Sequence, residues 1–301
     1  MIRMTIAGLA LAFCASAVPT ATAAAPAETF DVGIARVERH GEVGPPLILI
    51  PGLASGAWVW QDTIAALAGE HRIYAVTLAG FDGRPPAAGD ALAQASGALE
   101  ELIASRRLKR PVLVGHSLGG ILALTFAAAH SDLVRGVVAV DALPVFPTTE
   151  TVPAAQRPAL AERVRAQIAG LSTAEFEAQQ LQYMQRIGVV DAAAATAAAQ
   201  RTSRSDPKAV AGYAAAVMAL DARAQLPGIR VPVLEVVPYL AGDYAAAGVS
   251  AEGKRAYYAS LLAGVTQLEV VTIAPARHFV MLDQPQAFVA ALRGFLAGLK
   301  N

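Results

Sequence analysis

One cysteine in 301 residues leaves this chain without the means to form an internal disulfide, so packing of the core must stabilise the fold. Charged residues are also scarce, at 16% of the chain against 55% hydrophobic residues. This composition excludes a largely disordered protein and is typical of a well-packed globular one. The length is sufficient for one large core that carries an inserted subdomain.

No charge of one sign dominates the chain. Lys and Arg together number 24, Asp and Glu together number 24, and the densest basic cluster is the short stretch 106–110. A solvated helix end explains that cluster, because basic side chains there complement the helix dipole. The sequence therefore carries no electrostatic footprint for nucleic acid or for an anionic lipid surface, and we expect neither as a partner.

The N-terminal residues 1–23 are typical of a targeting segment. Arg3 is their only charge, an apolar stretch covers 6–18, and A-T-A at 21–23 forms an A-x-A cleavage site. The apolar stretch is shorter than the roughly 20 residues that a membrane-spanning helix needs. We therefore expect a signal peptide, a secreted or periplasmic protein, and no stable membrane insertion after cleavage. The single cysteine, Cys14, would be removed with the signal peptide.

Short apolar runs alternate with helical patterns along the rest of the chain. The runs do not alternate between apolar and polar residues, which is typical of strands buried on both faces. Strands separated by helices indicate an α/β fold with a mostly parallel sheet. The expected strands cover 47–50, 73–76, 112–114, 137–140, 233–237 and 268–273.

The pattern changes after the run at 137–140. Long Ala-rich stretches replace the β-rich runs, and apolar residues such as Leu160, Val164 and Ile168 recur at helical spacing. We interpret 144–226 as an inserted α-helical lid. The remaining parts are then a leader with the first strand region at 24–44, a first part of the core at 45–143, and a second part at 227–301.

The sequence G-H-S-L-G at 115–119 lies directly between an expected strand and an apolar helix. In that context G-x-S-x-G is a nucleophile elbow, in which the serine occupies a strained turn and the glycines avoid clashes that a Cβ would create. The amide of Leu118 would lie at a helix N-terminus, where it can stabilise a developing oxyanion. The motif therefore predicts Ser117 as a nucleophile, and the absence of G-x-G-x-x-G and of Gly-Lys-Ser/Thr argues against a phosphate loop.

Residues 47–299 resemble the α/β-hydrolase superfamily with a lid after the sixth strand. The resemblance rests on I-P-G-L at 50–53, A-G-F at 79–81 and R-H-F at 277–279, besides the elbow. Pro51 stands where the family usually has His, so only the backbone role of that turn carries over. By this resemblance the amide of Leu53 would be the second oxyanion donor.

A serine nucleophile needs a neutral imidazole that takes its proton, and the chain has 5 histidines. His278 is the candidate base, because it follows the last expected strand by a short loop and so returns to the edge of the sheet that carries Ser117. His116 adjoins the serine and is expected to support the elbow. The other histidines show no metal-ligand spacing, and we expect neither a metal nor another cofactor.

The acid that orients the base has two candidates. In the order Ser, Asp, His of the resembled family, Asp243 follows the expected strand 233–237, where relatives usually carry the acid. Asp141 directly follows the strand 137–140, which is the alternative position. We favour Asp243, because an aspartate at a strand end such as Asp141 also serves as a turn or cap residue.

These residues predict a carboxylesterase-like serine hydrolase that cleaves small or medium hydrophobic esters through an acyl-enzyme on Ser117. Trp58 and Phe81 fall on loops at the carboxyl edge and are candidates for lining the substrate pocket, with ordinary packing as the alternative. The resembled fold also hosts thioesterases, lactonases, C–C hydrolases and haloperoxidases. A non-catalytic ligand-binding protein is a further alternative, which the absence of an acid near Ser117 and His278 would favour. The sequence leaves the oligomeric state open.

Overall fold

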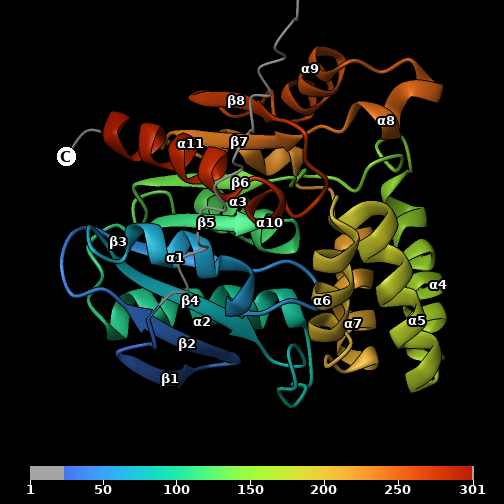
Figure 1. Ribbon diagram of the computed structural model, residues 1–301, viewed down its shortest axis with the longest axis horizontal. Coiled ribbons are helices and arrows are strands. Elements are labelled where there is room, and N and C mark those ends of the chain that lie inside the picture. The colour runs from blue at the N-terminus through green and yellow to red at the C-terminus, as the bar shows by residue number, and fades with distance from the viewer. Residues whose placement is uncertain (1–23, 300–301) are drawn as a thin grey trace, which may run out of the picture.

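A sheet of eight strands in the order β1-β2-β4-β3-β5-β6-β7-β8 forms the centre of the molecule (Figure 1). The computed structural model describes residues 24–299. Strands β3 to β8 are parallel to one another, whereas β2 is antiparallel to both β1 and β4. The strands are β1 (Glu28–Val32), β2 (Ala35–His40), β3 (Pro46–Ile50), β4 (Arg72–Leu78), β5 (Val112–His116), β6 (Gly136–Val140), β7 (Val233–Pro238) and β8 (Leu268–Ile273). The prediction of an α/β fold with a mostly parallel sheet is confirmed.

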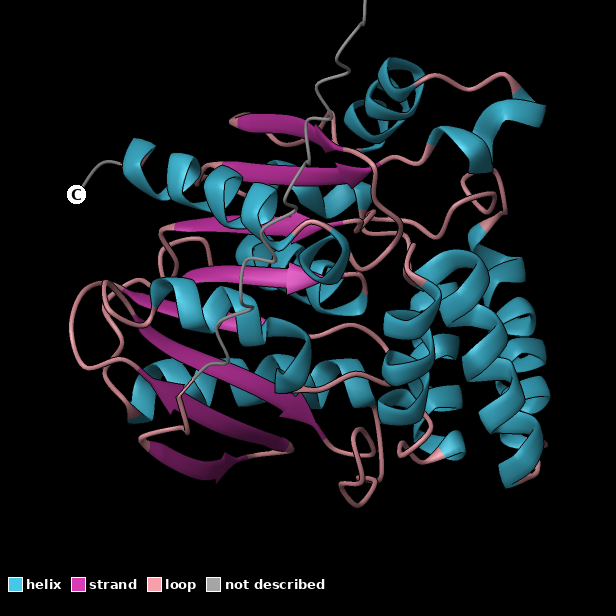
Figure 2. Cartoon of the chain, in the orientation of Figure 1, coloured by secondary structure: helices cyan, strands magenta, loops and turns pink. Residues whose placement is uncertain are grey.

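Helices cover both faces of the sheet (Figure 2). Successive residues of a strand point to opposite faces, so each of the central strands contributes to two cores. In β3, for example, Ile48 belongs to one hydrophobic cluster and Leu47 to the other, and both side chains are fully buried. The flanking helices are α1 (Gln61–Leu67), α2 (Ala91–Ser105), α3 (Leu118–Ala129), α10 (Val280–Asp283) and α11 (Pro285–Gly298). This double burial explains why the strands have no polar alternation.

A helical insert separates β6 from β7. It contains α4 (Arg157–Ala169), α5 (Thr173–Tyr183), the π-helix η3 (Met184–Gly188), α6 (Ala192–Thr202) and α7 (Pro207–Ala219). Three of these helices have a side-chain N-cap. Ser172 forms a capping box at α5, and Asp191 and Asp206 accept from backbone amides at the starts of α6 and α7. The insert lies beyond the ends toward which the arrows of β5 and β6 point (Figure 1). Two short helices, α8 (Ala241–Tyr244) and α9 (Ala251–Leu261), follow β7.

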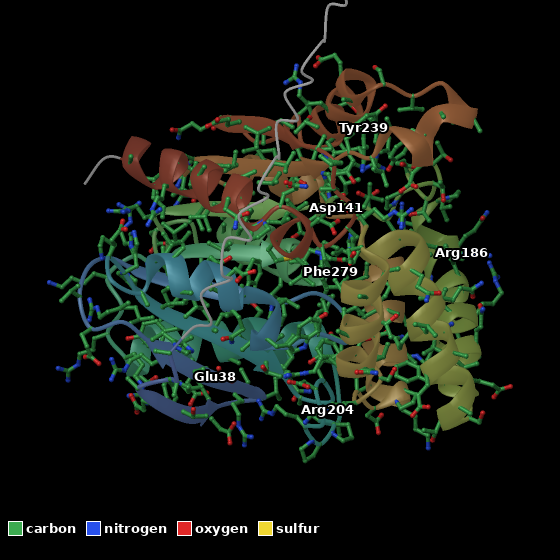
Figure 3. All side chains as sticks on the ribbon, in the orientation of Figure 1. Glu38, Asp141, Arg186, Arg204, Tyr239 and Phe279 are labelled. Atoms are coloured by element: carbon green, nitrogen blue, oxygen red, sulfur yellow. The ribbon has the colours of Figure 1, made fainter. Side chains whose placement is uncertain are left out.

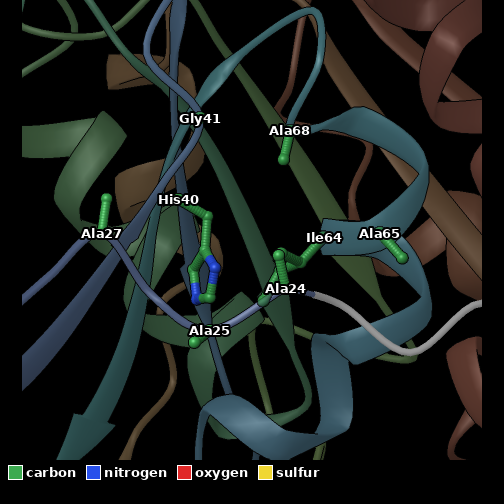
Figure 4. A pocket seen from close by; sticks show the side chains of 8 residues that line it. All are labelled: Ala24, Ala25, Ala27, His40, Gly41, Ile64, Ala65 and Ala68. Atoms are coloured by element: carbon green, nitrogen blue, oxygen red, sulfur yellow. The ribbon is translucent and has the colours of Figure 1, made fainter.

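The first strand region expected at 24–44 forms a hairpin of two strands, β1 and β2. Its residues alternate between buried and exposed positions, with Val37 buried and Arg36 exposed, as expected at the edge of a sheet. A cavity of about 210 Å³ lies where residues 24–27 pass β2 and α1, and His40 is the polar side chain of its lining (Figure 4). His40 pairs with Ile73 at the start of β4, so this cavity lies at the amino edge of the parallel strands.

The expected signal peptide at 1–23, with Cys14, lies outside the described residues. Within residues 24–299, no helix combines the length and the apolar character needed to cross a membrane.

Candidate active site

Ser117 occupies a strained turn between β5 and α3. Its backbone has φ 52° and ψ −116°, a combination that a residue with a Cβ rarely adopts. The Ser117 amide donates to the carbonyl of Val140 at 2.9 Å, which fixes the turn against the end of β6. The side chain keeps part of its surface exposed, whereas the neighbouring residues His116 and Leu118 are buried. The turn therefore presents the hydroxyl at the carboxyl edge of the sheet.

The glycines of the motif permit the close approach of backbone segments at this turn. A Cβ on Gly115 would lie 2.2 Å from the carbonyl oxygen of Gly119, and a Cβ on Gly119 would lie 2.3 Å from the carbonyl oxygen of Ile50. A Cβ on Gly120 would meet the Cβ of Ala142 at 2.4 Å. Any larger residue would push the elbow away from β3 and β6.

His278 lies on the loop after β8, as the sequence predicts. Its backbone carbonyl accepts from Nε2 of His116 at 3.0 Å, and the two imidazole rings pack with centroids 4.4 Å apart. Because His116 directly precedes Ser117, this contact brings the His278 loop against the elbow. Burial, with a further contribution from His278, holds the pKa of His116 well below its usual range, so the His116 ring stays neutral.

Asp141 contacts the His278 imidazole directly. Nδ1 of His278 and Oδ2 of Asp141 are 2.5 Å apart, and the other carboxylate oxygen accepts from the hydroxyl of Tyr258 in α9. Burial by itself would raise the pKa of Asp141, but the hydrogen bond and charge of His278, the charge of Lys254 and the Tyr258 hydroxyl together lower it to about 2. Asp141 is therefore a carboxylate that can only accept hydrogen bonds, and Nδ1 of His278 must carry the proton.

Asp243, the acid favoured from the sequence, does not contact His278. Its carboxylate accepts from Nε and Nη2 of Arg277 at 2.8 and 2.9 Å. This ion pair, more than any other cause, lowers the pKa of Asp243. The preference for Asp243 over Asp141 is thus wrong. The guanidinium of Arg277, one residue before the histidine, binds the Asp243 carboxylate. Asp141, at the alternative position after β6, is the aspartate that binds His278. Figure 3 labels Asp141 where the sheet meets the helical insert.

Two backbone amides next to the elbow are available for an oxyanion. The amide of Leu118 is the first of α3, and the amide of Leu53 belongs to the turn that follows β3. Neither donates a hydrogen bond to another group among residues 24–299. The two segments lie close together, because a Cβ on Gly52 would be 3.3 Å from the Cβ of Ser117.

The two aromatic candidates for the substrate pocket differ in exposure. Trp58, in the short helix η1 (Ala57–Trp60), is only partly buried and lies beneath the guanidinium of Arg201 from α6, 5.6 Å from its ring centroid. Phe81 is 0% exposed, and its ring packs 4.8 Å from that of Tyr213. A ring without accessible surface cannot contact a substrate, so the prediction for Phe81 is wrong and ordinary packing explains it.

Several residues near the site were not identified from the sequence. Tyr183, at the end of α5, packs in a T-shaped arrangement with His278, with 6.1 Å between the ring centroids. Glu235, in the middle of β7, is 0% exposed and accepts from the amide of Ala142 at 3.1 Å. Burial raises its pKa well above the usual range. A charged residue within an apolar strand was the available signal for Glu235, whereas nothing in the sequence pattern distinguishes Tyr183.

Comparison with known proteins agrees with this architecture. A family model described as the alpha/beta hydrolase family matches residues 47–291, and the chain therefore belongs to that family. It is 27% identical over 209 residues to pimeloyl-(acyl-carrier protein) methyl ester esterase of Vibrio atlanticus (strain LGP32), a match that covers 66% of this chain and 77% of that protein. Over 110 residues it is 34% identical to the protein of the same name from Aeromonas hydrophila, covering 36% of this chain and 42% of that protein.

Solved structures show the same fold. The enol-lactonase from Burkholderia xenovorans LB400 superposes with a TM-score of 0.69 at 18% identity, covering 90% of this chain and 100% of the other. A thermophilic esterase from Thermogutta terrifontis superposes with a TM-score of 0.71 at 22% identity, covering 90% and 98%. Together with the family match, these similarities identify the chain as an alpha/beta hydrolase, as its sequence motifs indicate.

Proposed function

We propose that this chain is a serine hydrolase that cleaves small or medium hydrophobic esters, with Ser117 as nucleophile, His278 as general base and Asp141 as the orienting acid. The observation that carries the proposal is the short contact between Asp141 and Nδ1 of His278, made beside a nucleophile elbow. A carboxylate on Nδ1 leaves the lone pair of Nε2 free, which is the state a base for a serine hydroxyl requires. The esterase names of two relatives support the same chemistry.

The reaction follows from these roles. His278 takes the proton of the Ser117 hydroxyl while the oxygen attacks the acyl carbonyl, and the amides of Leu118 and Leu53 stabilise the oxyanion that forms. The imidazolium, held by Asp141, then protonates the departing alcohol. Water, deprotonated by the same imidazole, attacks the acyl-enzyme and releases the acid with Ser117 restored.

The surroundings of Ser117 support a hydrophobic substrate. Leu53, on the turn after β3, and Tyr183, whose ring packs against that of His278, are partly exposed apolar or aromatic side chains near the elbow and the imidazole. Trp58, on η1 of the same connection after β3, is a further partly exposed aromatic side chain. An ester with an apolar acyl or alcohol part would bury surface against such side chains, which favours its binding over that of a charged substrate.

A fluorophosphonate probe tests the nucleophile. We expect the wild-type protein to be labelled and Ser117→Ala to lose both the label and the hydrolysis of aryl and alkyl esters. Ser131, on the loop after α3, is buried against the backbone of Arg230, and Ser131→Ala provides a matched control that keeps the label. Labelling of Ser117→Ala at the wild-type rate would remove the proposal, and a panel of esters, thioesters and lactones then defines the substrate class.

A non-catalytic role for this fold would fit a chain without an acid on its histidine. The contact between Asp141 and His278 argues against that alternative. Absence of labelling in the wild-type protein would revive it.

We further propose that residues 1–23 direct export of the protein, on the basis of their sequence alone. Expression of the full chain in a bacterium, followed by N-terminal sequencing, is expected to give a periplasmic or secreted product that begins at Ala24. A cytosolic product that retains Met1 would contradict this proposal.

A further inference from the structure

The helical insert is joined to the loop that carries His278. Helix α5 continues without a break into the π-helix η3, which ends at Gly188. The last carbonyl groups of any helix have no partner within it and must find donors elsewhere. Single π-turns next to α-helices are frequently found at functional sites.

The histidine loop supplies these donors through its backbone. The amide of His278 donates to the carbonyl of Ile187 at 3.1 Å, and the amide of Phe279 donates to the carbonyl of Gly188 at 2.9 Å. Both bonds connect segments that are about ninety residues apart in the chain. Any movement of η3 away from the sheet would therefore pull on the backbone of His278 itself.

The side chain of Arg277 strengthens the same junction. Its Nη1 donates to the carbonyl of Gln185 at 2.7 Å and to that of Val189 at 3.3 Å. A cation is favoured at this position, because the C-terminal end of a helix carries partial negative charge. The guanidinium, which belongs to the histidine loop, thus caps the C-terminal end of the α5–η3 helix.

Two carboxylates hold this arginine in place. Asp243 of α8 binds Nε and Nη2 in a bidentate pair, and 19% of the Arg277 side chain is exposed. Asp283 of α10 accepts from the amide of Arg277 at 2.8 Å with one oxygen and from the amide of Val190 at 2.9 Å with the other. The junction therefore joins α8, the insert, the histidine loop and α10.

We propose that Arg277 is a positioning residue, which ties the end of α5–η3 to the histidine loop so that the helical insert sets the place of the His278 imidazole. This inference rests on the proposed function, in which His278 is the base. It assigns to Asp243 the role of anchoring Arg277. It also predicts that this end of the insert stays attached to the histidine loop, so that substrate is admitted without separating η3 from residues 277–279.

The test compares substitutions at the junction with a matched surface pair. Arg277→Met removes the guanidinium and keeps an unbranched apolar stem, Arg277→Lys keeps the charge without the bidentate geometry, and Asp243→Asn weakens only the anchor. Arg255→Met is the control, since Arg255 of α9 makes a similar bidentate pair with Glu252 in solvent. The readouts are kcat and KM with an aryl ester, the rate of fluorophosphonate labelling, and hydrogen exchange of the His278 and Phe279 amides.

We expect Arg277→Met to lower kcat and the labelling rate about 10- to 100-fold with KM within about threefold, because a displaced base impairs the reaction more than substrate binding. Its His278 and Phe279 amides should exchange at least about tenfold faster. Arg277→Lys should fall between this variant and the wild type, Asp243→Asn should lose about threefold, and the control should stay within about twofold. Millimolar guanidinium should restore part of the labelling of Arg277→Met.

Wild-type kcat, labelling and amide protection in Arg277→Met would overturn the inference. If this variant does not fold, Asp243→Asn decides, and unchanged labelling and exchange in it have the same meaning. If the wild-type protein is neither labelled nor active, the proposed function fails, and the exchange measurement still tests the junction. Faster exchange in Arg277→Met then supports it, and unchanged exchange overturns it.

Discussion

Replacement of Asp141 by Asn tests the proposed acid most directly. Asn has the shape of Asp but presents an amide group, so with Tyr258 still donating to the remaining oxygen the amide would face Nδ1 of His278. Nδ1 would then have to accept, and the ring proton would move to Nε2, where the lone pair is needed for Ser117. An equivalent exchange in a Ser-His-Asp triad lowers kcat by about 10⁴, and we expect a loss of about 10³ to 10⁴ here.

The same substitution has a calculable effect on stability. The displacement of the Asp141 pKa from 3.8 to about 2 corresponds to roughly 2 kcal/mol in favour of the charged carboxylate in the folded protein. Because the folded pKa is the lower one, this contribution is fully present above pH 4 or so and is lost as the pH falls toward about 2. Asp141→Asn should therefore have a weaker dependence of unfolding free energy on pH across that acidic range than the wild-type protein.

The assay pairs Asp141→Asn with Asp243→Asn. Steady-state kinetics with an aryl ester at neutral pH give kcat for both variants. Denaturant unfolding from about pH 2 to about pH 7 gives the free energy of unfolding as a function of pH. Asp243→Asn should retain kcat within about tenfold, because its carboxylate binds Arg277 and not the imidazole. A loss of about 10³ in Asp243→Asn together with near wild-type kcat in Asp141→Asn would refute the reasoning.

Three further substitutions test the neighbouring groups. Glu235→Gln should be more stable than the wild type with a difference that grows as the pH rises above 4.5, since the raised pKa of the buried carboxyl makes the folded protein bind the extra proton there; equal unfolding profiles would contradict this. Tyr258→Phe should lower kcat about 3- to 10-fold through loss of the hydrogen bond to Asp141, with activity assays as the check and Tyr257→Phe as the control. Gly119→Ala should reduce stability and labelling together, because its Cβ would lie 2.3 Å from the Ile50 carbonyl, whereas Gly97→Ala, which meets open space in α2, should melt at or above the wild-type temperature.

Much of the fold could be predicted because its signals are local. The apolar runs that became β3 to β8 are buried on both faces, and this double burial removes polar residues from the sequence at those positions. The hairpin β1–β2 lies at the exposed edge, where charged residues such as Arg36 and Asp31 pair across the strands and break the apolar pattern. The elbow was equally local, since the conformation of Ser117 is set by glycines two positions away.

The acid could not be chosen from local signals. Both Asp141 and Asp243 follow strands that end at the same edge, and which carboxylate reaches His278 depends on competition for partners. Arg277, next to the histidine, binds the Asp243 carboxylate and keeps it from the imidazole, while the hydroxyl of Tyr258 from α9 donates to Asp141. Such pairings depend on segments brought together by folding, and no spacing in the chain records them. The sequence likewise contains no sign that η3 would end against the histidine loop.

The three proposed catalytic side chains do not share the same mechanical support. The amide of Ser117 is bonded to the carbonyl just before Asp141, so the tips of β5 and β6 hold nucleophile and acid in register even if the outer part of the sheet shears. The imidazole comes instead from beyond β8, the last strand of the sheet, most of which is partly exposed to solvent. Heating, or substitutions that introduce larger side chains along that flank, would displace the base while the nucleophile and acid stayed aligned. The protein should therefore lose its activity at a lower temperature than the one at which it unfolds.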